Sequence, residues 1–263
     1  LNSGADCYMT DFEDSLTPTF NNLINGQLNI KDAISKKIDF IDKKSGKEYK
    51  LNKKTAVLII RPRGLHLDEK NITINNKRIS GTFFDLGLSL FHNAKKLIEN
   101  NSGPYFYLPK LEHYLECRLL NEIISFCEKK LNLEIGTVKV TVLIETINAV
   151  FQMNEFLWEL KDHIVGLNAG RWDYLFSYQK VYRNTKNVIL PDRSKVNMFV
   201  PFMSNYNKLL VNTCHKRGAF GMGGMSAQVI AKANPKEVNE KALESVKKDK
   251  ERELNQGNDG AWV

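Results

Sequence analysis

Acidic residues follow two segments that have the composition of buried β-strands. Glu145 comes directly after residues 138–144, which are rich in β-branched types, and Asp173 follows the apolar residues 165–168 and a short glycine-containing turn. The carboxyl ends of neighbouring strands lie at the same end of a parallel α/β fold, so we expect the two carboxylates to lie close together. Paired carboxylates share a proton, act as acid and base, or bind a hard divalent cation.

Magnesium is the cation that these acids fit best. Mg²⁺ is usually held by one or two carboxylates, while water and substrate fill its remaining positions. Asp11 and Glu13 end another predicted strand, share one face at strand spacing, and are expected to hold water molecules bound to the metal. A second interpretation of this acidic run is the start of a helix, with Asp14 and Ser15 in its N-cap and first turn.

Glycines near these acids favour anion binding. The turn before Asp173 is expected to leave the backbone N–H groups of Gly170, Arg171 and Trp172 free to bind an anion beside the metal. A second glycine-rich segment, residues 221–225, has two open interpretations. It either binds a phosphate group through its backbone N–H groups or allows a tight turn.

An arginine ends the second predicted strand. Arg61 follows the apolar residues 57–60, and a guanidinium emerging from such a run needs an anionic partner, because leaving it buried and unpaired is costly. Two partners stay open: a structural salt bridge with Asp11 or Glu13, or an oxyanion or carboxylate of a substrate. Together these residues predict a metal-dependent enzyme that acts on a small anionic substrate.

The composition excludes several classes of protein. The chain has 263 residues, 42% of them hydrophobic and 10% aromatic, which is too apolar for a disordered chain and enough for one large domain. No apolar run reaches the roughly 18 residues of a membrane span. The net charge of +8 comes from basic pairs interleaved with acids, so we expect no nucleic-acid partner. The four cysteines form no Cys-x-x-Cys pair, which indicates reduced, mostly buried thiols in a cytosolic protein.

Short β-like runs alternate with longer helical patterns, which predicts a parallel α/β fold. Strands are expected at residues 7–11, 56–60, 105–108, 138–144, 165–168, 198–202 and 219–222. Helices are expected at residues 80–100, 111–131, 147–161, 206–217 and 235–255, the last of them highly charged and exposed. Surface hairpins are expected near residues 36–55 and 71–79, around Ser45-Gly46 and Asn75-Asn76.

A closed (β/α)8 TIM-type barrel fits this alternation better than an open sheet. No Gly-x-Gly-x-x-Gly fingerprint of a dinucleotide-binding sheet opens the first helix. Charged residues and glycines instead recur at the carboxyl ends of the predicted strands, where a barrel builds its active site. Seven predicted strands are one fewer than a barrel needs, so we interpret residues 1–263 as an incomplete barrel domain with a single core.

A series of sequence blocks, in the same order along the whole chain, resembles the A-type malate synthases. The blocks lie at residues 2–5, 11–15, 61–67, 103–112, 143–146, 166–174, 190–193 and 200–203. They include the runs Arg-Pro-Arg-Gly at 61–64 and Ala-Gly-Arg-Trp-Asp-Tyr at 169–174. Any one block is weak support for this family, whereas the ordered series is specific.

The resemblance implies an acyltransferase of the glyoxylate cycle. It condenses acetyl-CoA with glyoxylate and water to give malate and CoA, with Mg²⁺ as cofactor. By position in the family motifs, Glu145 and Asp173 correspond to the metal ligands and Arg61 to the catalytic arginine. The other implied site residues hold the metal's water molecules or bind glyoxylate: Asp11 and Glu13 in the first role, and Gly170, Arg171, Trp172 and Asp173 in the second.

The resemblance also implies parts that this chain does not contain. We expect the first barrel strand to precede Leu1, and a C-terminal helical domain with the catalytic aspartate to follow Val263, so that the chain alone is inactive. Asp192 and Asp259 are interpreted as turn residues and are not assigned as the base.

Two alternatives to this function stay open. One is a citrate-lyase-like enzyme or malyl-CoA lyase of the same Mg²⁺-dependent barrel superfamily, and the other is an inactive piece that only binds metal and glyoxylate. The expected partners are acetyl-CoA and glyoxylate as substrates, with no membrane. The expected location is the cytoplasm, or the peroxisome or glyoxysome in a eukaryote.

Overall fold

The computed structural model describes residues 1–226, 228 and 230–262. The chain divides into two compact units. The first unit consists of Leu1–Pro109 and Leu120–Val140, and the second consists of Lys110–Leu119 and Thr141–Val263. Strands that alternate with helices make up each unit, as the sequence pattern predicted.

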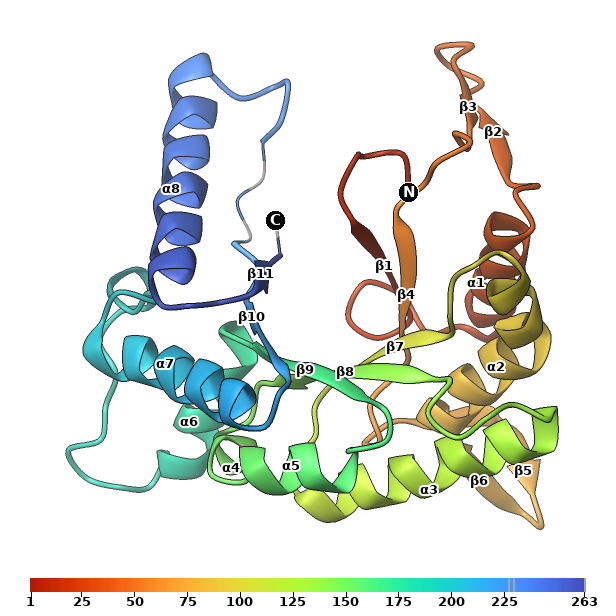
Figure 1. Ribbon diagram of the computed structural model, residues 1–263. Helices are drawn as coiled ribbons and strands as arrows, with labels where there is room; N and C mark the ends of the chain where they lie inside the picture. Colours follow the sequence, from red (N-terminus) through yellow and green to blue (C-terminus); the bar gives the residue numbers. More distant parts are fainter. Residues whose placement is uncertain (227, 229, 263) are drawn as a thin grey trace. The chain divides into compact units, whose positions relative to one another are not determined.

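Three parallel strands form the sheet of the first unit (Figure 1). They are β1 (Cys7–Asp11), β4 (Val57–Arg61) and β7 (Tyr105–Leu108). β4 lies between the other two and is parallel to both. The last residue of β1, Asp11, lies opposite the last residue of β4, Arg61. This register brings two predicted site residues together at the carboxyl ends of adjacent strands.

Two helices, α1 (Phe20–Ile34) and α2 (Gly81–Glu99), pack against each other in this unit, and part of α3 (Tyr114–Leu131) also belongs to it. α1 was not predicted. Its N-cap is Thr19, whose side chain accepts a hydrogen bond from the N–H of Asn22. The interpretation of Asp14 and Ser15 as a helix start is therefore wrong, because the helix begins one turn later.

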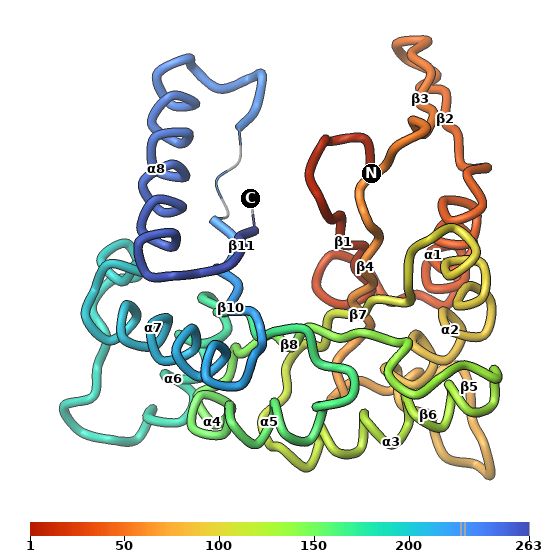
Figure 2. The backbone as a smooth tube through the Cα atoms, in the orientation of Figure 1, coloured from red at the N-terminus to blue at the C-terminus, as the bar shows by residue number. Residues whose placement is uncertain are grey.

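Both predicted surface hairpins are confirmed (Figure 2). One consists of β2 (Asp39–Ile41) and β3 (Glu48–Lys50), and the other of β5 (Asp68–Ile74) and β6 (Lys77–Ser80). Asn75 and Asn76, between β5 and β6, have φ angles of 52° and 61°. Asparagine tolerates this left-handed backbone better than most residues, which is why it favours such two-residue turns.

The strands of the second unit follow one another in the order β8-β9-β10-β11. They are β8 (Lys139–Ile144), β9 (Ile164–Ala169), β10 (Phe220–Gly223) and β11 (Gly260–Ala261), of which β8 begins in the first unit. β10 is parallel to both β9 and β11. The two-residue strand β11 was not predicted, because two residues are too short for a periodic pattern.

Helices and one 3-10 turn (Arg193–Lys195) connect these strands. The helices are α4 (Ile147–Val150), α5 (Met153–Glu159), α6 (Trp172–Tyr182), α7 (Pro201–Lys216) and α8 (Lys236–Asn255). α6 was not predicted. The helix expected at 147–161 is divided at Phe151 and Gln152. Figure 1 shows α7 beside β10, which it contacts.

The strand expected at residues 198–202 is wrong. Pro201 begins α7, and proline suits the first position of a helix because its fixed φ matches the helix and its missing N–H needs no partner there. Buried residues then recur at helical spacing, at Met203, Tyr206, Asn207, Leu210, Val211 and Cys214. The apolar run before them is the entry to this helix.

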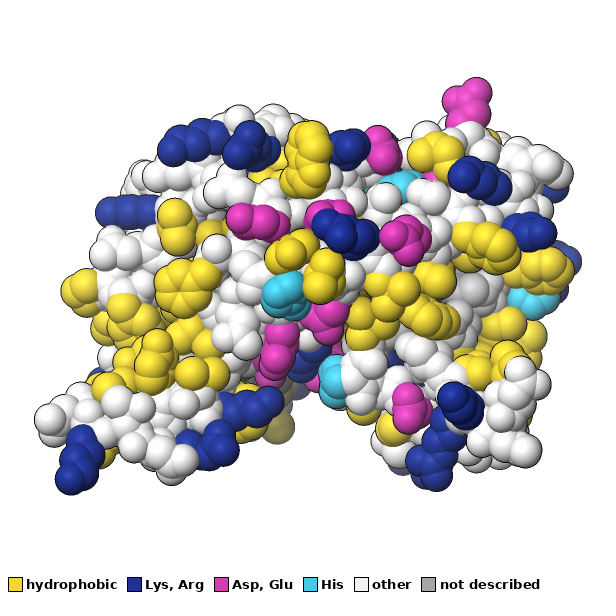
Figure 3. All heavy atoms as spheres, turned by 90° about the horizontal axis from the view of Figure 1, so that it is seen from below, with side chains coloured by type: hydrophobic (Ala, Val, Ile, Leu, Met, Phe, Trp, Pro, Cys, Tyr) yellow, Lys and Arg dark blue, Asp and Glu magenta, His cyan; other side chains and the backbone are white. Residues whose placement is uncertain are grey.

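All four cysteines are free thiols, as predicted. Cys117 and Cys214 are buried, whereas Cys127 is half-buried and Cys7 is exposed. Within the residues described above, no helix is both long enough and apolar enough to cross a membrane. On the face drawn in Figure 3, basic and acidic side chains are interspersed, in agreement with the interleaved charges of the sequence.

Candidate active site

One candidate cluster surrounds Arg61 in the first unit. Its Nε atom donates a hydrogen bond to Asp11 Oδ1 at 2.7 Å, and its Nη2 atom lies 2.5 Å from Asp11 Oδ2. Nη1 lies 3.6 Å from Glu13 Oε2 and 3.5 Å from Asp14 Oδ2. The Arg61 side chain is only 9% exposed. The predicted salt bridge is therefore present, and it involves three acids.

Arg61 and Asp11 favour each other's ionised state. Burial alone raises the pKa of Asp11, but the hydrogen bonds and charge of Arg61 outweigh it, so the pKa of Asp11 is lowered. Asp11 also accepts hydrogen bonds from the Ser15 hydroxyl and from two backbone N–H groups. Both carboxylate oxygens of Asp11 therefore accept hydrogen bonds from within the chain. A role for Asp11 and Glu13 in holding metal-bound water stays a prediction.

Arg63, in the same sequence block, forms a buried ion cluster instead of a site. Its guanidinium lies 2.8 Å from Asp85 Oδ1 and 2.9 Å from Glu69 Oε2, and all three side chains are at most 3% exposed. The Arg63 N–H also donates to Asp85. These contacts tie the segment after β4 to α2 and β5, so Arg63 has a structural role beside Arg61.

A second cluster, in the second unit, contains both predicted metal ligands. Glu145 directly follows β8, and Asp173 is the second residue of α6. The ammonium of Lys110 lies 3.1 Å from Asp173 Oδ2 and 3.6 Å from Glu145 Oε2. The Lys110 N–H donates to Glu145 Oε1 at 2.6 Å. The structure thus brings the two carboxylates together around a single lysine.

Lys110 is the residue of this cluster that the sequence did not single out. It lies in one of the family-like blocks, two residues after β7, and has a left-handed backbone with φ of 60°. Its position just past the carboxyl end of a strand could have indicated a site residue, because barrel enzymes place their site residues there.

Burial makes the charge of Glu145 costly. Its side chain is 3% exposed, and desolvation, opposed by Lys110 and reinforced by Asp173, raises the pKa of Glu145 to about 8. A divalent cation would favour the ionised form. Among the described residues, no group of three or more His, Cys, Asp or Glu side chains gathers as a metal site. Two carboxylates nevertheless fit Mg²⁺, which usually keeps several waters.

The turn before Asp173 differs from the prediction at Gly170. Its N–H donates to the carbonyl of Ile144 at 2.9 Å, so it is not free to bind an anion. A Cβ atom at this position would lie 2.6 Å from Glu145 Cβ and 2.8 Å from the Ile144 carbonyl oxygen. The glycine is needed because β8 and the turn approach so closely, and that approach places Glu145 beside Asp173.

We expect Gly170→Ala to destabilise the protein by about 1–3 kcal/mol, because the added methyl group must push Glu145 or the β8 backbone aside. Urea unfolding monitored by circular dichroism measures this change. Gly87→Ala is the matched control, since a Cβ atom there meets nothing within 4 Å. In a helix this control should stabilise the fold by up to about 1 kcal/mol. Equal midpoints for the two variants would contradict the steric argument.

The side chains of the turn are also engaged. The Arg171 guanidinium binds Asp249 and Glu253 of α8, at 2.6 and 2.5 Å. The Trp172 ring stacks with the Arg193 guanidinium, 4.4 Å from its centroid, and lines a pocket of about 530 Å³. Direct contacts of Gly170, Arg171, Trp172 and Asp173 with a substrate stay predictions.

The glycines at 221–225 favour the packing interpretation over a phosphate site. A Cβ atom on Gly223 would lie 2.2 Å from the Glu253 carboxylate, and one on Gly224 would lie 2.3 Å from the Ala169 carbonyl oxygen. A buried carboxylate at this position repels a phosphate. Gly223 therefore makes room for Glu253, and Gly224 makes room for the Ala169 carbonyl and the Arg171 side chain.

Asp192 and Asp259 have the structural roles expected of them. Asp192 caps the 3-10 turn by accepting from the Ser194 N–H and hydroxyl. Asp259 accepts from the Gly221 N–H at 2.7 Å and lies 2.9 Å from His215 Nε2.

Both clusters belong to a fold with known relatives. A family model for the malate synthase TIM-barrel domain matches residues 57–263. The chain belongs to the malate synthase family. The match confirms the predicted barrel class and includes Arg61, Glu145 and Asp173, whereas Asp11 and Glu13 precede it.

Relatives in the malate synthase family are similar over the entire chain. The chain is 51% identical to malate synthase from Dictyostelium discoideum and 49% identical to malate synthase A from Escherichia coli strain K12. All of the chain is aligned in both comparisons, against 48% and 49% of these relatives. It therefore spans about half the length of the curated relatives it matches.

Solved structures share the fold at much lower identity. A Haloferax volcanii malate synthase magnesium/glyoxylate complex matches with a TM-score of 0.66 and 13% identity, over 98% of this chain and 62% of that chain. A citrate lyase from Burkholderia xenovorans matches with a TM-score of 0.57 and 18% identity, over 78% and 53%. At such identities the likeness shows the fold alone.

Proposed function

We propose that the protein carrying this sequence condenses acetyl-CoA with glyoxylate and water to malate and CoA. The observation that carries this proposal is the pair of carboxylates, Glu145 and Asp173, held together at strand ends in a member of the malate synthase family. The names of the two relatives above support the same activity. No relative named above at about 50% identity is a lyase, so the lyase alternative is not favoured.

Glu145 and Asp173 are the proposed ligands of Mg²⁺. Their oxygen donors suit a hard cation, and the related Haloferax volcanii protein was solved with magnesium and glyoxylate. Bound Mg²⁺ supplies a positive charge that polarises the aldehyde of glyoxylate. The ammonium of Lys110 lies near both carboxylates and offsets part of their negative charge.

Arg61 is the proposed catalytic arginine. When a proton leaves the methyl group of acetyl-CoA, negative charge develops on the thioester oxygen, and a guanidinium stabilises that charge. Asp11 holds the Nε and Nη2 atoms of Arg61, which fixes the plane of the guanidinium. We assign the general base to no residue of this chain, since Asp192 and Asp259 are already engaged in turns.

The first turn of α6 is the proposed binding site for the glyoxylate carboxylate. The N–H groups of Arg171 and Trp172 lie at the start of this helix, where the helix dipole favours an anion. Because Gly170 donates to Ile144, it contributes to this site through its shape and not through its N–H.

Release of CoA from acetyl-CoA and glyoxylate, followed with a thiol reagent, tests this function. We expect release that depends on both substrates and on Mg²⁺, and that stops on adding EDTA. In a second assay, the same protein is incubated with malyl-CoA in the absence of acetyl-CoA and glyoxylate. Cleavage of malyl-CoA without synthesis from acetyl-CoA would instead favour the lyase, and Mg²⁺ binding without either reaction would favour the inactive alternative.

The names and organisms of the relatives support a proposal for the cellular compartment. The Brassica napus relative is named glyoxysomal, and another relative comes from a bacterium. We propose the cytoplasm for a bacterial source and the glyoxysome or peroxisome for a eukaryotic one.

A further inference from the structure

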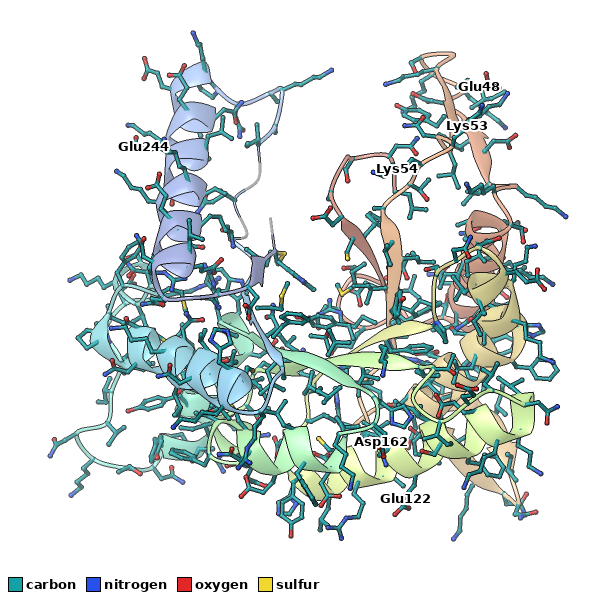
Figure 4. All side chains as sticks on the ribbon, in the orientation of Figure 1. Glu48, Lys53, Lys54, Glu122, Asp162 and Glu244 are labelled. Atoms are coloured by element: carbon teal, nitrogen blue, oxygen red, sulfur yellow. The ribbon has the colours of Figure 1, made fainter. Side chains whose placement is uncertain are left out.

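The charged helix α8 is exposed along most of its length but buries ionic side chains near its end. Figure 4 shows Glu244 projecting away from the helix, and its salt bridge with Lys248 joins two side chains that are each 63% exposed. Closer to the end of the helix, Asp249 and Arg252 are 7% exposed and Glu253 is 1% exposed. The prediction of an exposed helix is therefore wrong for one face of its last two turns, whereas Glu251 and Leu254 are exposed there as predicted. Buried charges need specific partners.

The main partner of these buried acids is Arg171, directly before α6. Its Nη2 atom lies 2.6 Å from Asp249 Oδ2 and 2.5 Å from Glu253 Oε1, and it also donates to the carbonyl of Gly224 at 3.0 Å. The Arg171 side chain is 11% exposed. One guanidinium group thus joins two residues of α8 to the turn after β9.

Other side chains complete the network and make it rigid. Lys250 lies 2.9 Å from Glu253, and Arg252 lies 3.1 Å from Asp249. The Ser226 hydroxyl donates to Asp249 at 2.9 Å. Two acids are therefore shared among three cations, and each acid has more than one partner, which resists reorientation of any single side chain.

The backbone of β10 is shaped to admit this network. Any side chain at Gly223 would occupy the position of the Glu253 carboxylate, because its Cβ atom would lie 2.2 Å away. A Cβ atom at Gly224 would lie 3.0 Å from Arg171 Nε. These two glycines place the buried carboxylate of α8 against the end of β10 and next to Arg171.

Arg171 and Asp173 both belong to the first turn of α6. Arg171 is the N-cap residue of α6, and its carbonyl accepts a hydrogen bond from the N–H of Leu175. Asp173 lies within that turn, and its own side chain is 36% exposed and contacts Lys110. A rotation of the turn would move Asp173 relative to Glu145, so the contacts that restrain Arg171 also restrain the carboxylate pair.

We propose that Asp249 and Glu253 of α8 are positioning residues that hold Arg171 and thereby align Asp173 for binding the metal and glyoxylate. This inference rests on the proposed function of the Glu145 and Asp173 pair. It assigns α8 a role in the site itself, although none of its residues is proposed to contact the substrate. It also accounts for the contact of the Arg171 guanidinium with these two acids.

Glu253→Gln in the protein that carries this sequence tests the proposal, because it keeps the shape of the side chain and removes its charge. Glu244→Gln is the matched control on the exposed part of the same helix. Substituting a residue that orients a metal ligand typically lowers metal affinity by about 10–100-fold. We therefore expect Glu253→Gln to raise the dissociation constant for Mn²⁺ about tenfold. Electron paramagnetic resonance of Mn²⁺, without substrates, measures this constant. The KM for glyoxylate should rise with it, and Glu244→Gln should change neither value.

Asp249→Asn provides a second variant should Glu253→Gln prevent folding, and Arg171→Lys tests the cation. Arg171→Lys should retain more metal affinity than Arg171→Gln, because lysine keeps the charge between the acids. A purely structural network would lower the unfolding midpoint in Glu253→Gln while leaving the Mn²⁺ constant and KM unchanged, and that result would overturn the proposal. Failure of the wild-type protein to bind Mn²⁺ or to release CoA would instead refute the proposed function.

Discussion

Replacing Asp173 with alanine should reduce Mg²⁺-dependent release of CoA by at least about a hundredfold, because the metal would lose one of its two proposed carboxylate ligands. Glu145→Ala should have an effect at least as large. The Glu145 side chain is the more buried of the two, at 3% against 36% exposure, so water has less access to replace it. Titration of activity with Mg²⁺ and calorimetry of Mg²⁺ binding in the absence of substrates measure the two consequences separately.

Glu122→Gln is the control for these substitutions. Glu122 is an exposed acid of α3, labelled in Figure 4, and it takes part in neither cluster. Its substitution should leave both the Mg²⁺ titration and CoA release unchanged. An Asp173→Ala protein that binds Mg²⁺ with the affinity of the wild type would refute the ligand assignment, even if its activity were lost.

Arg61→Lys should lower kcat by about 100-fold or more while Mg²⁺ affinity stays the same. Loss of a single donor that stabilises a developing oxyanion has an effect of about this size. Lysine keeps the positive charge, but it cannot reproduce the two hydrogen bonds that Arg61 donates to the two oxygens of Asp11. The ammonium would therefore lose the fixed orientation that Asp11 imposes. Steady-state kinetics at saturating Mg²⁺ and calorimetry measure the two quantities.

Arg118→Lys is the matched control for Arg61→Lys. Arg118 also donates two hydrogen bonds to one carboxylate, that of Glu159, but its side chain is 51% exposed. Exposed ion pairs contribute only about 0–1 kcal/mol, so neither kcat nor folding should change measurably. Similar losses of kcat in both variants would show that the effect of Arg61→Lys comes from general disruption. Reduced Mg²⁺ affinity in Arg61→Lys would assign Arg61 to the metal site instead of to the thioester oxygen.

The sequence predicted three strands to within one residue of their observed bounds. Cys7–Asp11 and Tyr105–Leu108 have the predicted bounds, and β8 begins one residue later than expected. Tyr105–Leu108 and β8 are largely buried, and buried parallel strands are short runs rich in β-branched and aromatic side chains. Because chemistry-bearing residues follow such runs directly, Arg61 and Glu145 could be singled out without a structure.

Other elements depend on tertiary contacts that local patterns do not reveal. α6 is rich in aromatic residues, which have weak helix propensity, and its Tyr174 stacks on Tyr206 of α7. In α1, which contacts α2, only four residues are buried, among them Leu23 and Ile30. So few buried positions give a weak helical pattern in the sequence. At residues 198–202, apolar composition alone could not separate a strand from the start of a helix.

The sequence by itself determined the residue types of the site and their order along the chain: acids after two strands, an arginine after a third, and a glycine turn before Asp173. Only the tertiary structure decided which groups are engaged with one another. In the folded chain, Lys110 contacts both carboxylates and the Gly170 N–H donates to the Ile144 carbonyl. The Arg171 guanidinium contacts the acids of α8. Strand composition is a local property, whereas the partner of a buried charge is chosen by whichever distant residue the fold brings within about 3 Å.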